Sequence, residues 1–307
     1  MNKIFELRKK INILENEPMS LHTSFKTGGP ARFYARPGDF TELALLVEAA
    51  ASDGLPVFIL GGGANILVAD KGISGLVIAT GGLRRHSLEG SLLRAGAGLP
   101  ISDAAGFAAD AGLEGLDFIH AMPGSAGGAV YMNARCYGYS VSDVLEELSF
   151  LPPGGLLPEK RGIEELRAGF AYKKSPFQSG GSLSGAVIIE AVFRLRPGDK
   201  ALIRDNMRRI EEDRKAKGHF MAPSAGSVFK NNHAFGQPTG KILDELGMRG
   251  FRHGGAQVSP LHGNIIINTG NASSGDIRGL MEILAMRAKD ERGIVLEPEI
   301  IFAGEWE

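Results

Sequence analysis

Two glycine-rich runs hold residues whose types and spacing could do chemistry. The first lies between two apolar stretches, and its candidate binding residues are Leu60, Gly61, Gly62, Gly63, Ala64 and Asn65. Residues without a Cβ atom let successive backbone N–H groups turn toward one point, which forms a nest suited to a pyrophosphate. For this run taken alone, a tight turn with no ligand is the alternative.

The second run begins about sixty residues later, and Pro123 fixes the backbone at its entry. Its candidate binding residues are Pro123, Gly124, Ser125, Gly127 and Gly128. We expect backbone donors here to hold the same anion, so the two runs together favour a long ligand with a central pyrophosphate. The first run is not the dinucleotide fingerprint of a Rossmann fold, because Ile66 stands where the third glycine belongs.

Other ligand chemistries find no support in the sequence. The Gly-Lys pair at 240–241 is followed by Ile242, so the spacing of a P-loop is missing. The seven histidines show no metal-like spacing, and we expect no metal site. The single cysteine, Cys136, excludes an internal disulfide and a multi-cysteine metal site.

Composition narrows the class of protein. The 307 residues carry a formal net charge of −1, so nothing indicates a surface for nucleic acid or anionic lipid. No stretch reaches the ~20 apolar residues that cross a bilayer, and the N-terminus lacks the apolar core and cleavage site of a signal peptide. We therefore expect a cytoplasmic protein without membrane insertion or nucleic-acid partners.

The elements that must position the glycine runs are short strands and helices. Residues 1–20 predict an amphipathic N-terminal helix, and residues 101–115 predict a packed, alanine-rich helix. Short runs rich in Val and Ile predict strands: PVFIL, NILVA, GLVIA and AVIIEAVFRL. A change to highly charged sequence at 196–199 predicts a boundary between domains at 21–197 and 198–307.

The second domain has its own elements. In a charged run from residue 201, Ile203, Met207 and Ile210 recur on one helical face, which predicts a helix. GSVFKN, GNIIIN and LEPEIIFAG predict strands, and KILDELG predicts a short helix. The segment 274–292 predicts a helix with an apolar stripe. Both domains are therefore α+β.

Seven segments in a fixed order resemble the UDP-N-acetylenolpyruvoylglucosamine reductase family, over residues 20 to 305. The FAD-binding half is matched by HTSFKTGGPA, by GGGAN with Asp70 and Gly75 behind it, and by PGSAGGAVYMNA. The substrate half is matched by AYKKSPF, AGSVFKN, GGAQVSPLHGN and LEPEI. The short segment 172–227 is similar to the second subtype of the family, which lacks a tyrosine-bearing lid insertion.

This resemblance implies a fold and a reaction. The fold is an FAD-binding domain of the vanillyl-alcohol-oxidase (PCMH) type, followed by a smaller α+β substrate-binding domain. The cofactor is FAD with NADPH as co-substrate, and a UDP-sugar is the partner. The reaction reduces UDP-N-acetylglucosamine enolpyruvate to UDP-N-acetylmuramate during peptidoglycan precursor synthesis. We also expect a monomer.

The resemblance assigns roles to individual residues. Ser227 matches the proton donor to C2 of the enolpyruvyl group, and Glu299 matches a glutamate that stabilises the enolate intermediate. Lys173 stands where the family has an arginine, and it keeps the charge without the planar two-pronged geometry. Asn133 joins the cofactor-binding residues. The substrate-binding residues implied are Tyr172, Lys217, Lys230 and Asn231.

Some features leave alternatives open. Taken without the resemblance, Ser227 is a turn or strand residue, and Glu299 is a solvated acid at a strand edge. Ala64 replaces a serine of the family, and Gly218-His219 replaces a common Gln-Pro. The competing functions are an FAD-dependent oxidoreductase with another substrate, such as an alcohol oxidised by oxygen, and a flavin-holding protein whose catalysis was weakened with the arginine.

Overall fold

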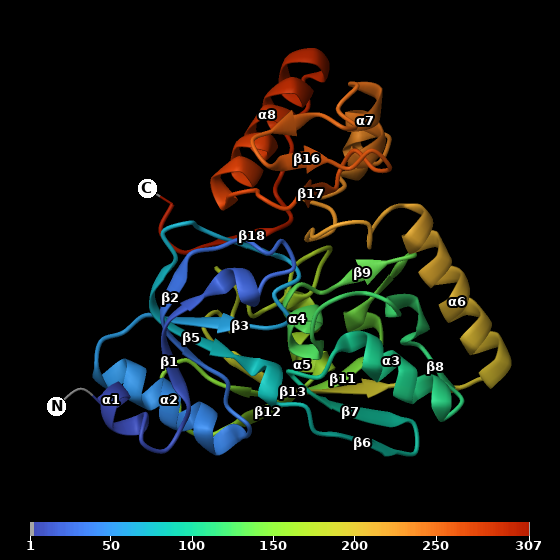
Figure 1. Ribbon diagram of the computed structural model, residues 1–307. Helices are drawn as coiled ribbons and strands as arrows, with labels where there is room; N and C mark the ends of the chain where they lie inside the picture. The colour runs from blue at the N-terminus through green and yellow to red at the C-terminus, as the bar shows by residue number, and fades with distance from the viewer. Residues whose placement is uncertain (1–2, 307) are drawn as a thin grey trace. The chain divides into compact units, whose positions relative to one another are not determined.

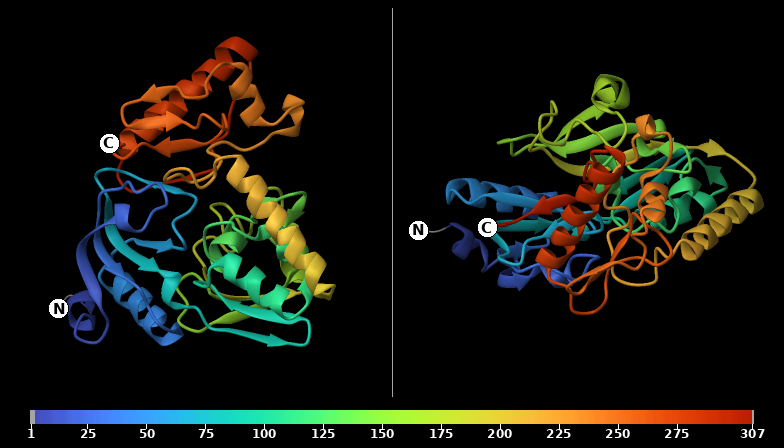
Figure 2. Two further views of the ribbon diagram at one scale, coloured as in Figure 1. Left: turned by 45° about the vertical axis from the view of Figure 1, so that its right-hand side comes forward. Right: turned by 90° about the horizontal axis from the view of Figure 1, so that it is seen from above.

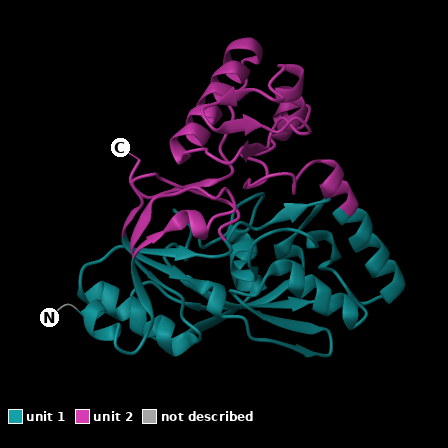
Figure 3. Ribbon diagram, in the orientation of Figure 1, with its two compact units in different colours: residues 1–15, 33–62, 75–211 teal, residues 16–32, 63–74, 212–307 magenta. Residues whose placement is uncertain are grey.

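A computed structural model describes residues 3–306 of the chain (Figure 1). The chain divides into two compact units that interleave along the sequence, shown in two colours in Figure 3. Among the described residues, unit 1 comprises 3–15, 33–62 and 75–211, and unit 2 comprises 16–32, 63–74 and 212–306. The expected contiguous domains at 21–197 and 198–307 divide the chain differently and stay a prediction.

The described residues contain eight α-helices and eighteen strands. The helices are α1 (Lys3–Leu7), α2 (Phe40–Ser52), α3 (Ile101–Asp110), α4 (Ala126–Tyr131), α5 (Ile163–Leu166), α6 (Lys200–Ala216), α7 (Thr239–Glu245) and α8 (Ser274–Arg292). The first nine strands are β1 (Ile13–Pro18), β2 (Pro30–Ala35), β3 (Val57–Leu60), β4 (Ile66–Val68), β5 (Ile73–Ala79), β6 (His86–Glu89), β7 (Leu92–Gly96), β8 (Leu113–Glu114) and β9 (Arg135–Cys136). The others are β10 (Tyr139–Ser140), β11 (Leu145–Leu151), β12 (Glu159–Gly162), β13 (Val187–Arg194), β14 (Arg196–Pro197), β15 (Arg252–His253), β16 (Ala256–Val258), β17 (Ile266–Asn268) and β18 (Ile301–Ala303).

A four-stranded sheet of order β1-β2-β5-β3 has β3 parallel to β5, and parts of β1, β2 and β5 belong to unit 2. Helix α2 begins where the Asp39 side chain accepts a hydrogen bond from the Glu42 N–H, at 3.0 Å. The helix buries Leu43 and Leu46 in a core shared with the sheet and α1. The N-terminal helix is shorter than expected: it covers only Lys3–Leu7, and β1 follows, so the prediction of a helix over 1–20 is wrong for 13–18.

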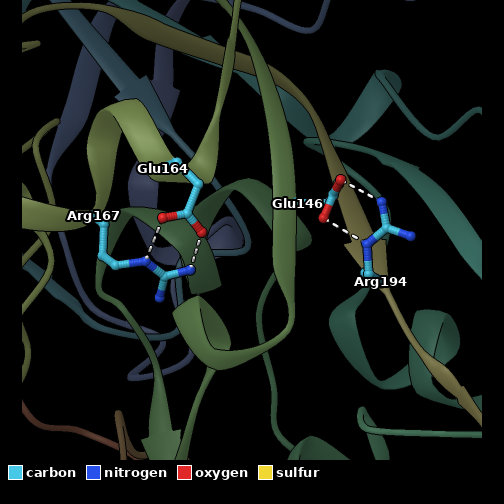
Figure 4. Close-up of polar contacts among 4 residues, drawn as sticks. All are labelled: Glu146, Glu164, Arg167 and Arg194. Carbon is cyan, nitrogen blue, oxygen red and sulfur yellow. Dashed lines mark hydrogen bonds and ion pairs between the residues drawn. The ribbon is translucent and has the colours of Figure 1, made fainter.

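A five-stranded antiparallel sheet of order β12-β11-β13-β7-β6 lies in unit 1. Its core holds large side chains such as Phe150 and Phe193, both fully buried. Figure 4 shows two ion pairs of this region: Glu146 with Arg194, which joins β11 to β13, and Glu164 with Arg167 near α5. These side chains are solvent-exposed, so the pairs contribute little to stability, about 0–1 kcal/mol each.

Helix α6 lies beside α3, as the two views of Figure 2 show, and Arg204 of α6 contacts Asp110 at the end of α3. Ile203 and Met207 are buried in the same core as α3. The first turns of α6 therefore pack in unit 1. The packing of unit 1 continues past residue 200, where the charged sequence begins, because the apolar face of α6 is buried against the core that contains α3.

Unit 2 contains the three-stranded sheet β15-β16-β17 with α8 packed against β15 and β16 (Figure 1). Helix α8 has the expected bounds. A capping box of Ser273 and Asp276 begins it, and Gly293 ends it at a φ of 67°. Its apolar stripe is buried as expected: Ile277, Leu280, Met281, Leu284 and Ala288. No helix within residues 3–306 is both long enough and apolar enough to span a bilayer.

Candidate active site

The start of the first glycine-rich run, residues 60–62, lies against the second run in unit 1. A Cβ atom on Gly62 would stand 2.6 Å from the Cα of Gly124, and one on Gly61 would stand 2.9 Å from the Ser125 Oγ. Real Cβ atoms do not approach backbone atoms this closely, so only glycine permits the contact at Gly62. The first run follows β3 and the second precedes α4. These two elements therefore fix the point at which the two backbone segments cross.

The second run forms a helix, and this changes which of its N–H groups are available. Ser125 caps α4 and accepts from the Gly128 N–H at 3.2 Å. The N–H groups of Ala126 and Gly127 donate to the carbonyls of Leu99 and Ala97, at 2.8 and 2.9 Å. The N–H groups of residues 126–128 are therefore already bonded within the chain, and the expected contacts of Gly127 and Gly128 with the cofactor stay a prediction. Gly127 also permits close packing, because a Cβ there would meet Ala97 at 2.8 Å.

The remaining donors fit an anion. Within the part of the chain that the structure describes, no acceptor contacts the N–H groups of residues 61, 62, 124 and 125 in unit 1. The same holds for the N–H groups of residues 63–65 in unit 2. Gly63 adopts a φ of 65°, and a Cβ there would lie 2.0 Å from the His22 carbonyl oxygen. Such a run of unpaired N–H groups on a tightly packed backbone is what a pyrophosphate needs.

A tight turn carries Tyr172 and Lys173 in unit 1. The Lys174 N–H donates to the Ala171 carbonyl at 3.0 Å, and Lys173 has the left-handed φ of 55°. Asn133, 3% exposed, donates its amide to the same Ala171 carbonyl at 2.8 Å. Its amide oxygen accepts from the Ser142 N–H at 3.1 Å. Asn133 therefore anchors this turn, and its expected contact with the cofactor stays a prediction.

In unit 2, Ser227 and Glu299 lie on two backbone segments that are hydrogen-bonded to each other. The Glu299 N–H donates to the Val228 carbonyl at 2.8 Å, and Phe229 forms an antiparallel bridge with Pro298. Ser227 is thus next to Val228, whose carbonyl is hydrogen-bonded to the Glu299 backbone. The sequence places these two residues 72 positions apart, and the fold joins them.

The first glycine-rich run is tied to the same place through Asn65. Its side-chain amide donates to the Glu299 carbonyl at 3.1 Å, and its own carbonyl accepts from the Ile301 N–H at 3.0 Å. The parallel pairing of β4 with β18 continues this contact. Within unit 2, the end of the glycine run and the backbone of Glu299 are therefore held in one register.

The expected substrate-binding residues of unit 2 have partners in the chain. Lys230 pairs with Glu297 at 2.5 Å, and Lys217 pairs with Asp213 at 2.6 Å. The Asn231 side chain accepts from the Thr239 N–H at 2.9 Å, at the start of α7. These contacts orient the three side chains, and a substrate would have to compete for them. Their roles in binding stay predictions.

Two histidines near Lys217 were not selected from the sequence. The rings of His219 and His262 lie 6.2 Å apart. Burial, with a further contribution from Arg214, lowers the pKa of His219 to about 4, and burial also lowers the pKa of His262. Both side chains are therefore neutral at neutral pH. The sequence signal for His262 is its place in the motif GGAQVSPLHGN. No local pattern indicates that His219 lies close to it.

Comparisons with known families agree with both halves. Residues 31–158 match the FAD binding domain family, and residues 218–303 match the C-terminal domain of UDP-N-acetylenolpyruvoylglucosamine reductase. A BBE-like 1 variant from Physcomitrella patens shares the fold with a TM-score of 0.50 at 17% identity, over 64% of this chain and 44% of its own. The chain is thus an FAD-binding flavoprotein of the vanillyl-alcohol-oxidase (PCMH) type with an added C-terminal domain, which confirms the expected fold class.

Closer relatives identify the family. The UDP-N-acetylenolpyruvoylglucosamine reductase of Treponema pallidum (strain Nichols) is 40% identical over 94% of this chain and 93% of its own length. The crystal structure of the UDP-N-acetylenolpyruvylglucosamine reductase (MurB) from Thermus caldophilus is similar with a TM-score of 0.79 and 30% identity, over 97% of this chain and 99% of that one. The chain belongs to the UDP-N-acetylenolpyruvoylglucosamine reductase family, as the resemblance of its motifs predicts.

Proposed function

We infer that this chain reduces UDP-N-acetylglucosamine enolpyruvate to UDP-N-acetylmuramate, with FAD as cofactor and NADPH as reductant. The observation that carries the inference is the hydrogen-bonded pairing of the Ser227 and Glu299 segments in a chain of this family. The product is a precursor of peptidoglycan, so the enzyme serves cell-wall synthesis and, through it, cell shape and division.

The cofactor would be held mainly by backbone. The N–H groups of residues 61–65, with those of Gly124 and Ser125, are the candidates to hold the FAD pyrophosphate. FAD bound there and reduced by NADPH would supply the hydride for C3 of the enolpyruvyl group. The same glycines exclude side chains from the place where the backbones cross, which keeps these donors fixed before any ligand arrives.

The side chains supply a proton and stabilise charge. Negative charge develops at C2 and in the adjacent carboxylate, so this part of the substrate needs a proton donor and a cation. Ser227 is the proposed donor to C2, and its hydroxyl is acidic enough only toward a strongly basic carbanion. Glu299 is proposed to stabilise the enolate, and Lys173 is proposed to offset the carboxylate charge. Tyr172, Lys217, Lys230 and Asn231 are proposed to bind the sugar nucleotide.

Three finer points belong to the same proposal. We propose that the enzyme acts in the cytoplasm, where UDP-linked precursors and NADPH are made. We also propose that it acts as a monomer, because both residues that act on C2 come from one chain. The shortness of 172–227 supports the subtype without a lid insertion.

An anaerobic titration tests the proposal. Enzyme reduced by NADPH is mixed with the enolpyruvyl sugar nucleotide, and the flavin absorbance is followed until it returns. We expect one equivalent of substrate to reoxidise one equivalent of flavin, whereas simple alcohols and oxygen give no comparable turnover. A purified chain that binds no FAD at micromolar concentration, or reduced flavin that the substrate does not reoxidise, would contradict it.

A further inference from the structure

The segment that carries Ser227 is not part of a regular sheet. GSVFKN was expected to be a strand, but it forms only isolated bridges, one between Ser227 and Ile265 and one between Phe229 and Pro298. A segment with so few regular partners needs another means of holding its backbone, because unpaired buried N–H and C=O groups are costly.

Asn264 supplies that means on one side of the segment. Its backbone carbonyl accepts from the Val228 N–H at 2.9 Å. Its side-chain oxygen accepts from the Phe229 N–H at 3.0 Å, and its side-chain amide donates to the Phe229 carbonyl at 2.8 Å. The carboxamide therefore takes the place of a peptide group in a neighbouring strand. Asn264 is 1% exposed, so water does not compete for these bonds.

The other side of the segment is held by the strand that carries Glu299. The Val228 carbonyl accepts from the Glu299 N–H at 2.8 Å, and the Lys230 N–H donates to the Glu297 carbonyl at 2.9 Å. Every backbone N–H and C=O of residues 228 and 229 is thus bonded either to Asn264 or to Glu299. Moving Asn264 would move the whole segment relative to Glu299.

His262 fixes Asn264 in turn. The Asn264 N–H donates to the His262 Nδ1 at 3.1 Å, so this nitrogen must be unprotonated while the bond exists. The His262 ring lies over Gly240, where a Cβ would stand 2.7 Å from the ring. The ring is therefore confined by packing, and the chain of contacts runs from His262 through Asn264 to residues 228 and 229.

We propose that Asn264 is a positioning residue for the reaction, which clamps residues 228 and 229 so that Ser227 keeps its place relative to Glu299. The proposal rests on the function inferred above. It predicts that loss of the clamp affects the step in which Ser227 delivers its proton, and not the earlier step in which NADPH reduces the flavin. A misplacement of about 1 Å is enough to slow such a step about 100-fold.

Asn268 provides a matched control for a merely structural role. It is the last residue of β17, is 5% exposed, and also uses both ends of its carboxamide. Its amide donates to the Phe25 carbonyl at 2.9 Å, and its oxygen accepts from the N–H groups of Gly270 and Ala272. Like Asn264 it is buried and hydrogen-bonded at both ends of its carboxamide, but its side-chain partners among the described residues are Phe25, Gly270 and Ala272, not residues 227–230.

The experiment measures the two half-reactions separately by stopped flow on the FAD-loaded full chain. Flavin reduction by NADPH is one rate, and flavin reoxidation by UDP-N-acetylglucosamine enolpyruvate is the other. The variants are Asn264→Asp, which keeps the shape and the acceptor for the Phe229 N–H but loses the donor, Asn264→Ala, Asn268→Asp and Asn268→Ala. If Asn264→Ala does not fold, the isosteric Asn264→Asp carries the test.

We expect the Asn264 variants to slow reoxidation about 10- to 100-fold while reduction stays within about twofold of the wild type. The Asn268 variants should show a comparable drop in Tm with both rates nearly unchanged. Reoxidation at the wild-type rate in Asn264→Asp would overturn the proposal, as would equal slowing in the Asn268 variants. A wild-type enzyme that the substrate does not reoxidise would instead contradict the proposed function.

Discussion

The crossing of the two glycine runs in unit 1 and the Ser227 segment of unit 2 hold their backbones in place in different ways. Where Gly62 meets Gly124, the position is set by exclusion, because two backbones approach so closely that no side chain fits between them. Where Val228 and Phe229 meet Asn264, the position is set by hydrogen bonds from one buried carboxamide. An added Cβ atom would disturb the glycine crossing, whereas loss of a side-chain hydrogen bond would disturb the segment held by Asn264.

This difference suits the function proposed for each region. A pyrophosphate needs a surface of N–H groups that stays in place, and close backbone packing provides one without any functional side chain. Proton transfer needs one hydroxyl held relative to another group, and hydrogen bonds to the neighbouring peptides define that position more narrowly. Substitutions at the two regions should therefore separate FAD binding from the reaction of the substrate.

Ser227→Ala is expected to have the largest effect, and it should act on the substrate reaction without changing FAD binding. Removing the hydroxyl removes the proposed acid at C2, so reoxidation of reduced flavin by the substrate should fall about 10²- to 10⁴-fold. FAD content and flavin reduction by NADPH should be unchanged, as measured by absorbance and stopped flow. The exposed Ser87→Ala on β6 is the control. Reoxidation at the wild-type rate in Ser227→Ala would remove Ser227 from the mechanism.

Gly62→Ala should give the opposite pattern. The added Cβ would meet the Gly124 backbone at 2.6 Å, so the two runs must separate and the FAD Kd should rise about 10- to 100-fold. Residual holoenzyme should still show reoxidation near the wild-type rate. Gly106→Ala in α3 is the control, since its Cβ meets nothing within 4 Å and should stabilise the helix by about 0.5–1 kcal/mol. Unchanged FAD affinity in Gly62→Ala would refute the exclusion argument.

Acid should destabilise unit 2 through its two half-buried histidines, His219 and His262. The pKa of His219 is about 4 in the folded chain and 6.5 ordinarily, so the unfolded chain binds more protons between these values. The free energy of unfolding should therefore fall as the pH drops from about 6.5 to about 4, by on the order of 1–3 kcal/mol. Denaturant unfolding at pH 7 and pH 5 measures this loss.

His219→Gln is the matched variant for the acid effect. It removes the titrating group and should flatten most of the pH dependence, leaving the smaller part that arises from His262. A variant that loses as much stability as the wild type between pH 7 and pH 5 would show that other groups cause the loss.

The parts of the fold that sequence reasoning predicted are those whose signals are local. Helix α8 has a capping box at Ser273, a buried stripe and a terminal glycine, and its bounds were expected correctly. Helix α4 was missed because a run with Gly127 and Gly128 has poor helix propensity. Packing on Ala97 and the cap at Ser125 override that propensity.

The site divides in the same way. Motifs select the glycine runs, Ser227 and Glu299 as candidates, since each carries its own short pattern. The clamp by Asn264 depends on contacts with a segment 35 residues away, and no local pattern encodes such a contact. The available N–H groups of the second glycine run also could not be foreseen, because the carbonyls of Leu99 and Ala97 that occupy the others belong to a distant turn.

Lys173→Arg is expected to have the smallest effect. It tests whether the side chain at position 173 contributes only its positive charge to the substrate carboxylate. An arginine would restore the two-pronged geometry that suits a carboxylate, so reoxidation by the substrate should become about 2- to 10-fold faster. The left-handed φ of 55° at this position strains both side chains equally, so stability should not change. Lys174→Arg, one residue along the same turn, should leave the rate unchanged. Slower reoxidation in Lys173→Arg would mean that the turn around residue 173 is shaped for the point charge of a lysine.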